Sequence, residues 1–212
     1  MVNQAGDSDA LLARATSGDE AALAELFARY RDRMKRMVKL WLDRRLSGRI
    51  DPSDVVQEAF LEASKRLPEY ARKRDVPLLL WLRLVTGQKL TDLHRAHLGA
   101  KMRDAALEVS LYRGALPEAS SVMLAGQLLG QLTSASRVAI RAEVRLQVQA
   151  ALNSLEPLDR EVLALRHFEQ LNNEQTALAL GIKKSAASNR YVRSLARLKE
   201  ILSAIPGFAE NL

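Results

Sequence analysis

Apolar residues recur three or four positions apart along most of the chain, the spacing that lines up one face of an α-helix. No segment alternates apolar and polar residues over the length of a strand, so the pattern predicts an all-α fold without a sheet. A loop is predicted at residues 68–77 (PEYARKRDVP), which lie between two prolines. The predicted helices cover residues 9–45 with a break at 17–19, then 51–67, 78–98, 138–155, 158–168, 173–180 and 184–202.

The helical pattern weakens between residues 110 and 137. This stretch (SLYRGALPEASSVMLAGQLLGQLTSASR) contains three Gly, one Pro and six Ser or Thr, a composition typical of a linker. We therefore expect two small helical domains, residues 1–107 and 150–212, joined by a partly helical linker at residues 108–149. Within the linker, residues 122–132 are expected to form a short helix.

The chain is basic, with a formal net charge of +7 and a pI near 9.9. Its positive charge is clustered, since residues 29–49 hold nine Lys or Arg against two Asp, and residues 183–199 hold six against no acid. Such clusters indicate a polyanionic partner, and nucleic acid is the first candidate. A basic surface without a special partner would also produce the same total charge.

The composition excludes several classes of protein. The 212 residues include no cysteine, so disulfides and cysteine-ligated metal sites are excluded. No apolar run approaches the roughly 18 residues that span a bilayer, and the acidic start of the chain lacks a signal-peptide core. We expect a cytoplasmic protein without membrane insertion. Because no nucleophile–base pair or nucleotide-binding motif is recognisable, we expect neither enzyme activity nor a cofactor.

Residues 172–198 have the pattern of a helix-turn-helix. Asn172 or Asn173 is suited to cap the first helix. Ala177 is small where two helices must cross closely, and Gly181 tolerates the positive φ of a tight turn. The block therefore predicts a DNA-binding module.

The second helix of this block has two different faces. Ala187, Tyr191, Leu195 and Leu198 follow one another at spacings of 4, 4 and 3, which predicts a packed face. The remaining face is polar and basic, and is suited to reach bases and phosphates in a major groove. A solvated basic helix in a bundle is the alternative. The candidate DNA-binding residues are Lys183, Lys184, Ser185, Ala186, Asn189, Arg190, Arg193 and Arg197.

The stretch DPSDVVQEAF, residues 51–60, opens a helix that is acidic although the protein is basic. Asp51 and Asp54 are explained by helix-start chemistry, because a cap and a first-turn carboxylate both satisfy the helix N-terminus. Glu58 and Glu62 extend the acidic stripe along the face opposite the apolar one. Leu61 lies beside this stripe with Gln57, and is expected to be exposed. An exposed Leu framed by carboxylates indicates a docking surface for a basic helix of another protein.

Two alternatives for the acidic stripe stay open from the residues alone. Asp54 and Glu58 have the i, i+4 spacing of metal ligands, but the three His residues (94, 97 and 167) lie elsewhere in the sequence, so no metal is expected. The stripe could instead neutralise the protein's own basic segment at residues 29–49.

Three segments together resemble a known family. Residues 51–70 (DPSDVVQEAFLEASKRLPEY) resemble the D-x-x-D-hydrophobic-hydrophobic-Q-E-x-F segment of bacterial sigma factors of the extracytoplasmic-function (ECF) group. Residues 81–95 (WLRLVTGQKLTDLHR) resemble the group's W-L-x-x-x-A-x-N-x-x-x-D-x-x-R segment, and residues 152–198 resemble its fourth conserved region. With their surroundings, the matching segments cover roughly residues 22–107 and 150–202, in the family's order.

The resemblance implies a factor that binds core RNA polymerase and directs it to promoters. By position, the helix from Asp51 would dock on the clamp helices of the largest polymerase subunit. An anti-sigma factor or other inhibitor is a further candidate partner, because group members are often held by one. The implied polymerase-binding residues are Asp51, Asp54, Gln57, Glu58 and Leu61.

The resemblance also divides the promoter contacts between the domains. The N-terminal domain would capture unpaired bases of the minus-ten element, with an aromatic ring to stack on a base and cations to hold phosphates. The C-terminal helix would recognise the minus-thirty-five duplex. Gln88 stands where the family usually has Asn, and Ala186, Ala187 and Ser188 replace a common Thr-Val-Lys, so no promoter sequence follows. The implied minus-ten residues are Tyr70, Arg72, Lys73, Arg74, Gln88, Lys89 and Arg95.

Three rival functions remain compatible with parts of the pattern. An ordinary helix-turn-helix regulator would bind duplex DNA without polymerase. An enzyme acting on nucleic acid would use Asp51, Asp54 and Glu58 as metal ligands. An inactive adaptor would bind polymerase only. Transcription with core polymerase separates the sigma-factor hypothesis from all three.

Overall fold

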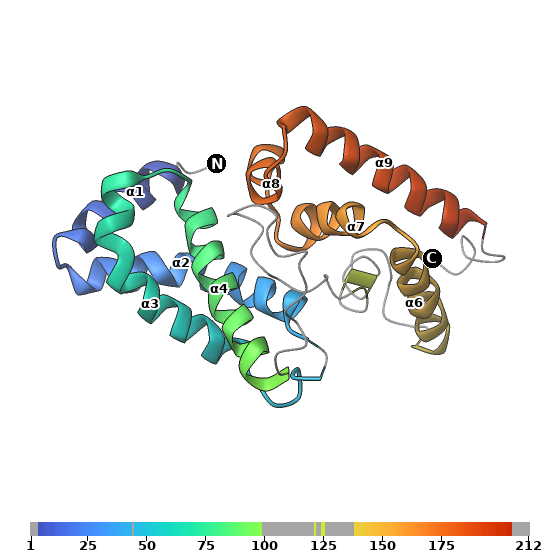
Figure 1. Ribbon diagram of the computed structural model, residues 1–212, viewed down its shortest axis with the longest axis horizontal. Helices are drawn as coiled ribbons and strands as arrows, with labels where there is room; N and C mark the ends of the chain where they lie inside the picture. The colour runs from blue at the N-terminus through green and yellow to red at the C-terminus, as the bar shows by residue number, and fades with distance from the viewer. Residues whose placement is uncertain (1–3, 44, 99–120, 122–123, 126–137, 205–212) are drawn as a thin grey trace. The chain divides into compact units, whose positions relative to one another are not determined.

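The structure is a computed structural model of the chain, and it describes residues 4–43, 45–98, 121, 124–125 and 138–204. Every regular element among these residues is helical, which confirms the predicted all-α class (Figure 1). The elements are α1 (Gln4–Thr16), α2 (Glu20–Trp41), α3 (Pro52–Lys73), α4 (Leu78–Leu98), α6 (Val138–Asn153), α7 (Pro157–Leu163), η3 (Ala164–Phe168), α8 (Asn173–Leu180) and α9 (Lys184–Ser203).

The described residues divide into two compact units. The first contains residues 4–38 and 45–98, and the second contains residues 39–43, 121, 124–125 and 138–204. The end of α2 thus belongs to the second unit by its contacts. The predicted domain boundaries at 107 and 150 stay predictions, and most of the short helix predicted at 122–132 lies outside the described residues.

The predicted break at residues 17–19 separates α1 from α2. Gly18 has a φ of +92°, which glycine adopts without strain. Asp19 then starts α2, because its Oδ1 accepts a 2.9 Å hydrogen bond from the backbone N–H of Ala22. This bond, together with the Arg14 guanidinium, lowers the pKa of Asp19. α2 ends at Trp41, four residues before the predicted end.

α3 begins where the sequence predicts. Asp51 is its N-cap, with Oδ1 accepting from the backbone N–H of Ser53 at 2.7 Å, and Pro52 occupies the first helical position. The predicted apolar face is correct: Val56, Ala59, Ala63 and Leu67 are buried, and the half-buried Phe60 continues the face. α4 packs along α3 and is buried on more than one side, since Arg83, Thr86 and His94 join its apolar residues in the interior.

The predicted loop at residues 68–77 is wrong, because α3 continues through Pro68 to Lys73. Pro68 is exposed and removes only one backbone donor, while the residues around it hold the helix in place. Tyr70 is the anchor: its hydroxyl donates to the carbonyl of Val76 at 2.9 Å and its ring stacks on Trp81 with centroids 4.5 Å apart. Arg74 is the C-cap of the helix, and its φ of +45° is left-handed.

The second unit contains the predicted helix-turn-helix. Asn172 caps α8 through a reciprocal pair of hydrogen bonds with Gln175, of 2.8 and 3.0 Å. Gly181 ends α8 with a φ of +65°, as the turn requires. The Asn173 amide then donates to the carbonyl of Lys184 at 2.9 Å, which ties the start of α9 to the start of α8. These local bonds fix the angle at which α9 leaves the turn.

The helix predicted at 158–168 exists as α7 followed by the single π-helical turn η3. In this turn the N–H of Glu169 bonds the carbonyl of Ala164, one residue wider than an α-helical bond. Across the described part of the chain, no helix combines the length and apolar character that crossing a membrane requires.

Candidate polymerase and promoter interfaces

The exposed side of α3 carries the residues predicted to bind polymerase. We call Asp54, Gln57, Glu58 and Leu61 the acidic edge. All four are exposed, and the Leu61 side chain is 60% exposed, which is rare for a leucine in this structure. Asp51 lies at the start of the same helix, where its carboxylate caps the backbone. The predicted exposure of Leu61 is therefore confirmed.

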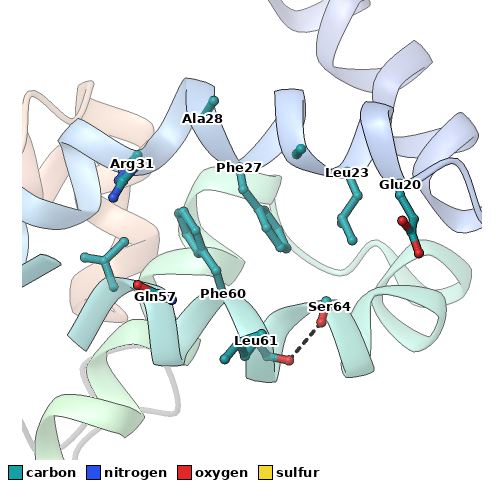
Figure 2. Close-up of a pocket in the computed structure, with 11 residues that line it drawn as sticks. Glu20, Leu23, Phe27, Ala28, Arg31, Gln57, Phe60, Leu61 and Ser64 are labelled. Atoms are coloured by element: carbon teal, nitrogen blue, oxygen red, sulfur yellow. Dashed lines mark hydrogen bonds between the residues drawn. The ribbon is translucent and has the colours of Figure 1, made fainter. Parts of the chain in front are cut away.

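An apolar groove of about 590 Å³ runs beside the acidic edge, between α2 and α3 (Figure 2). Its floor contains the stacked rings of Phe27 and Phe60, with centroids 4.5 Å apart. Leu61 lies at its rim on α3, and the Ser64 hydroxyl beside it is turned back to the Leu61 carbonyl at 2.8 Å. The groove therefore places an open apolar depression beside the acidic edge.

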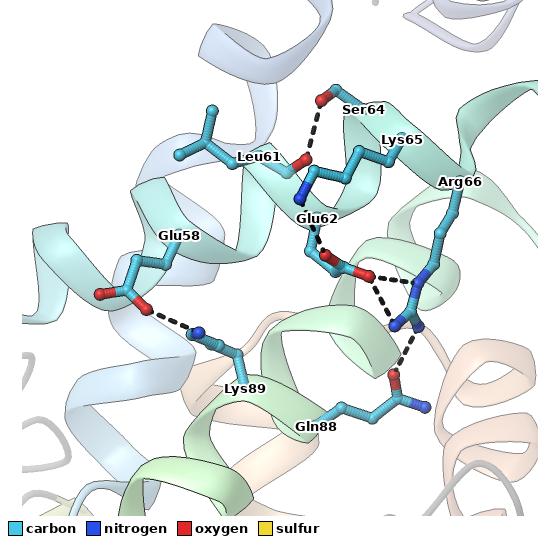
Figure 3. Close-up of polar contacts among 8 residues, drawn as sticks. All are labelled: Glu58, Leu61, Glu62, Ser64, Lys65, Arg66, Gln88 and Lys89. Carbon is cyan, nitrogen blue, oxygen red and sulfur yellow. Dashed lines mark hydrogen bonds and ion pairs between the residues drawn. The ribbon is translucent and has the colours of Figure 1, made fainter.

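Part of the acidic stripe is neutralised within the protein. Glu58 Oε2 lies 2.7 Å from Lys89 Nζ of α4, and Glu62 accepts from Arg66 of its own helix at 2.8 Å (Figure 3). The Arg66 bond is the main cause of the lowered pKa of Glu62. The pairing partners of Glu58 and Glu62 thus come from α4 and α3, and not from the basic segment 29–49 that the alternative interpretation named. Among the described residues, Asp54 has no ion-pair partner.

The metal alternative finds no support in the described ranges. No three or more His, Cys, Asp or Glu residues within them are arranged to hold an ion.

Tyr70 is not placed as a base-stacking residue. Its side chain belongs to the core, since the residue is only 8% exposed and its ring and hydroxyl are both occupied by Trp81 and Val76. This burial raises the pKa of Tyr70 to about 12. The stacking role suggested by the sequence is corrected to a structural one, because a base would have to displace Trp81.

The other candidate minus-ten residues are at the surface, and most have carboxylate or amide partners. Lys73 pairs with Glu69 at 2.8 Å, which raises the pKa of Lys73 and lowers that of Glu69. Arg72 is exposed and forms no ion pair with a described residue. The remaining contacts are Arg74 with Asp9 (3.1 Å), Arg95 with Asp92 (3.7 Å), Gln88 with Arg66 (3.0 Å) and Lys89 with Glu58 (2.7 Å).

α9 presents most of its predicted DNA-binding residues to solvent. Lys183, Lys184, Ser185, Asn189, Arg193 and Arg197 are exposed, and Ala186 is half-buried. Lys184 lies 3.8 Å from Glu174 and Arg197 lies 3.1 Å from Glu200, both between highly exposed side chains. Such pairs exchange readily for phosphate contacts because surface ion pairs are weak. Arg193 has no ion-pair partner among the described residues.

Arg190 behaves differently from its neighbours. Its Nη1 donates to Asp159 Oδ1 at 2.9 Å, and the two side chains are only 28% and 20% exposed. Glu156 lies within 3.9 Å of the same nitrogen. Arg190 therefore joins α9 to the start of α7, and its guanidinium is occupied in a way that sequence spacing alone does not reveal.

The predicted packed face of α9 is correct. Ala187 and Leu198 are buried, and Tyr191 and Leu195 are half-buried. The Tyr191 hydroxyl lies 3.1 Å from His167 Nε2, and Arg166 lies 5.0 Å from the centre of the tyrosine ring. Burial, and secondly the charge of Arg166, lower the pKa of His167. This face packs α9 against α7 and α8, and Tyr191 adds the contact with η3, while the opposite face is exposed.

Comparison with known proteins decides the family. The chain is 30% identical over 209 residues to the ECF RNA polymerase sigma factor SigD of Mycobacterium tuberculosis (strain ATCC 25618 / H37Rv), a match that covers 99% of this chain and 90% of SigD. The chain belongs to the ECF sigma factors. Residues 145–198 of this sigma factor also match the model of the family described as Sigma-70, region 4.

A shorter match to another sigma factor and a solved structure of the same fold accompany this relative. The sigma factor is 42% identical over 60 residues to the RNA polymerase sigma-E factor of Streptomyces coelicolor (strain ATCC BAA-471 / A3(2) / M145), which covers 28% of this chain and 34% of that protein. A solved structure titled "Structure of CnrH in complex with the cytosolic domain of CnrY" shares its fold, with a TM-score of 0.56 and 23% identity over 93% of this chain and 98% of CnrH.

Sequence reasoning missed several surface residues of this sigma factor. The groove lined by Leu23 and Phe27 is not predicted, because nothing in the sequence shows that α2 lies against α3. Val192 was also missed. It is highly exposed on α9 between Asn189 and Arg193, and a helical wheel centred on those two residues would have found it.

Proposed function

We propose that this ECF sigma factor binds core RNA polymerase through the acidic edge of α3, and that its α9 and the α3–α4 surface contact promoter DNA. The observation that carries the docking proposal is the exposed Leu61 beside an open apolar groove and beside Asp54, a carboxylate that has no ion-pair partner among the described residues. Such an arrangement suits a basic partner helix with one apolar side chain to bury. In the family pattern, this partner is the pair of clamp helices of the largest polymerase subunit.

The proposal for duplex DNA rests on α9. Its exposed face combines Asn189 and Arg193, which suit base edges and phosphates, with Lys183 and Lys184 at the helix start. No acidic residue lies on the helix before Glu200, so phosphates approach without repulsion from α9 itself. We propose that this face binds the minus-thirty-five element.

The proposal for the minus-ten element uses cations without Tyr70. Arg72 is exposed and has no ion-pair partner among the described residues, while Lys73, Arg74 and Arg95 have only exposed partners. We propose that these residues hold the backbone of the opened strand, together with Lys89 and the polar side chain of Gln88.

The chain itself is proposed to perform no covalent chemistry and to need no cofactor, because the polymerase catalyses RNA synthesis. Since that enzyme acts in the cytoplasm, we propose that the sigma factor acts there too. An anti-sigma factor is a further proposed partner on the strength of the family pattern.

Docking is tested by measuring the affinity of the fluorescently labelled full-length protein for core RNA polymerase. The combined variant Asp54→Arg with Glu58→Arg reverses two charges on the acidic edge, and is expected to weaken binding at least about tenfold. A matched control reverses Glu25 and Asp32, two exposed carboxylates of α2 that do not line the groove. Equal losses for both variants, or no loss for the first, would sink the docking assignment.

A further inference from the structure

One ion pair connects the two proposed binding surfaces of the first unit. Glu58 lies on the acidic edge, and Lys89 lies among the proposed minus-ten residues of α4. Their charged atoms, Oε2 and Nζ, are 2.7 Å apart (Figure 3). Each residue therefore neutralises the other in the free protein, although each is proposed to bind a different partner.

The geometry makes this pair exchangeable. The Lys89 side chain is 39% exposed and the Glu58 side chain 57%, so neither is locked into the interior. The hydrogen bond to Glu58 raises the pKa of Lys89, so the lysine stays charged and remains able to bind a phosphate. The lysine ammonium has three N–H donors, and the carboxylate at 2.7 Å occupies one of them and offsets the positive charge that would attract a phosphate.

The other acidic-edge carboxylate provides a contrast within the same helix. Asp54 lies one turn before Glu58 and has no ion-pair partner among the described residues. It belongs to the same acidic edge and contributes the same charge. An effect on DNA binding that follows substitution of Glu58 but not substitution of Asp54 therefore reports on the contact with Lys89, and not on the total negative charge of the acidic edge.

We propose that the Glu58–Lys89 pair couples polymerase docking to promoter binding. In the free protein the pair masks both charges. When a basic group of the polymerase forms an ion pair with Glu58, the Glu58–Lys89 pair breaks. Lys89 can then bind a phosphate of the opened strand. The inference rests on the proposed function, since it assumes that α3 meets polymerase and α4 meets DNA.

The expected coupling is small and reciprocal. An exposed ion pair of this kind changes an equilibrium constant by at most about fivefold. Thermodynamic linkage requires that docking strengthens DNA binding by the same factor as DNA binding strengthens docking. Removing either charge of the pair by substitution should therefore strengthen the binding of the other residue's partner by a similar factor. This reciprocity gives the proposal two independent measurements.

The first measurement uses the free full-length protein and a fluorescein-labelled oligothymidylate of about 20 nucleotides, at low salt. Glu58→Gln is expected to tighten binding about threefold more than Asp54→Asn, which removes an equal charge from the same edge. In a Lys89→Gln background, the two substitutions are expected to have equal effects. Equal effects of the two substitutions with Lys89 intact would overturn the proposal.

The second measurement uses core RNA polymerase without DNA. Lys89→Gln releases Glu58 and is expected to tighten docking by the same factor, about threefold. Arg95→Gln removes an equal charge from α4 and serves as the control, because Arg95 pairs with Asp92 of its own helix and with no other described residue. If both substitutions change docking equally, the coupling is absent.

These results separate the coupling from the proposed function. Suppose that reversal of the acidic edge abolishes docking, but neither the oligothymidylate measurement nor the polymerase measurement shows an effect larger than that of its control. The proposed function then stands and the coupling fails. If Glu58→Gln tightens oligothymidylate binding more than Asp54→Asn does, but core polymerase binds the Asp54→Arg, Glu58→Arg variant normally, the ion pair exists but α3 does not dock. The coupling proposal then fails together with the docking assignment. Thermal unfolding of each variant checks that the fold is retained.

Discussion

Arg190 and Arg193 lie three positions apart on α9, yet their surroundings are opposite. Arg190 is held by Asp159 at 2.9 Å in a largely covered contact, whereas Arg193 is exposed and has no ion-pair partner among the described residues. Both look alike in the sequence as basic residues on a recognition helix. The structure pairs Arg190 within its unit and leaves Arg193 exposed, which is the basis for the proposal that Arg193 contacts DNA.

Substituting these two arginines by alanine is expected to separate the roles. Arg193→Ala should weaken duplex DNA binding by the holoenzyme and reduce the slope of log affinity against log salt by about 1, without changing stability. Arg190→Ala should lower the free energy of unfolding by about 1–2 kcal/mol, because it leaves the half-buried Asp159 carboxylate without its partner. Salt titrations and urea unfolding provide the two readouts. A stability loss confined to Arg193→Ala would contradict the assignment.

Tyr70 offers a test by pH. Its pKa is raised to about 12 by burial, whereas an unfolded tyrosine titrates near 10. Below pH 10 the ring is neutral in both states, so its full contribution to stability is present. Between about pH 10 and 12 the unfolded state loses its proton first, so that contribution is lost as the pH rises.

The free energy of unfolding of wild type should therefore fall over this range relative to that of Tyr70→Phe, which has no hydroxyl to ionise at this position. At neutral pH, Tyr70→Phe should be about 1 kcal/mol less stable, because the hydrogen bond to Val76 is lost. Urea unfolding followed by circular dichroism at a series of pH values measures the difference. A difference that stays constant from pH 8 to 12 would show that Tyr70 is not buried in this way.

At the scale of elements, periodicity predicted where most helices lie but not where each one ends. The capping residues Asp51 and Asn172 mark true helix starts because their bonds are local. The prediction of a loop at 68–77 is wrong because Pro68 would end the helix only if no other contact stabilised the turn that follows it. Tyr70 holds it through Trp81 and Val76, and these contacts depend on tertiary structure. The groove and the Glu58–Lys89 pair escaped prediction for the same reason.

The proline in α3 is expected to cost stability. Pro68 is exposed, lies inside the helix and cannot donate the backbone hydrogen bond of its position. Pro68→Ala should raise the free energy of unfolding by about 1–3 kcal/mol. Asn172→Ala, which removes the capping box of α8, should lower it by about 1 kcal/mol. Urea unfolding of the full-length protein checks both, and a Pro68→Ala variant less stable than wild type would show that the proline has a structural role.

At the scale of the whole molecule, the distribution of charge follows the proposed partners. The chain is basic overall, with an acid-free helix α9 up to Lys199, and its acidic edge lies on one face of α3. The family assignment accounts for both signs, because a sigma factor meets nucleic acid and a protein partner at once. Sequence reasoning could predict this division from helical wheels, since exposure of Asp54, Glu58 and Leu61 follows from helix periodicity alone.

Transcription reconstituted with purified core RNA polymerase on a library of genomic fragments tests the central claim most directly. The wild-type factor is expected to direct initiation from a discrete set of start sites. The Asp54→Arg, Glu58→Arg variant should lose that initiation although it still unfolds in a cooperative thermal transition, and the Glu25→Arg, Asp32→Arg control should retain it. Initiation that does not respond to reversal of the acidic edge, or specific duplex binding without any initiation, would contradict the account.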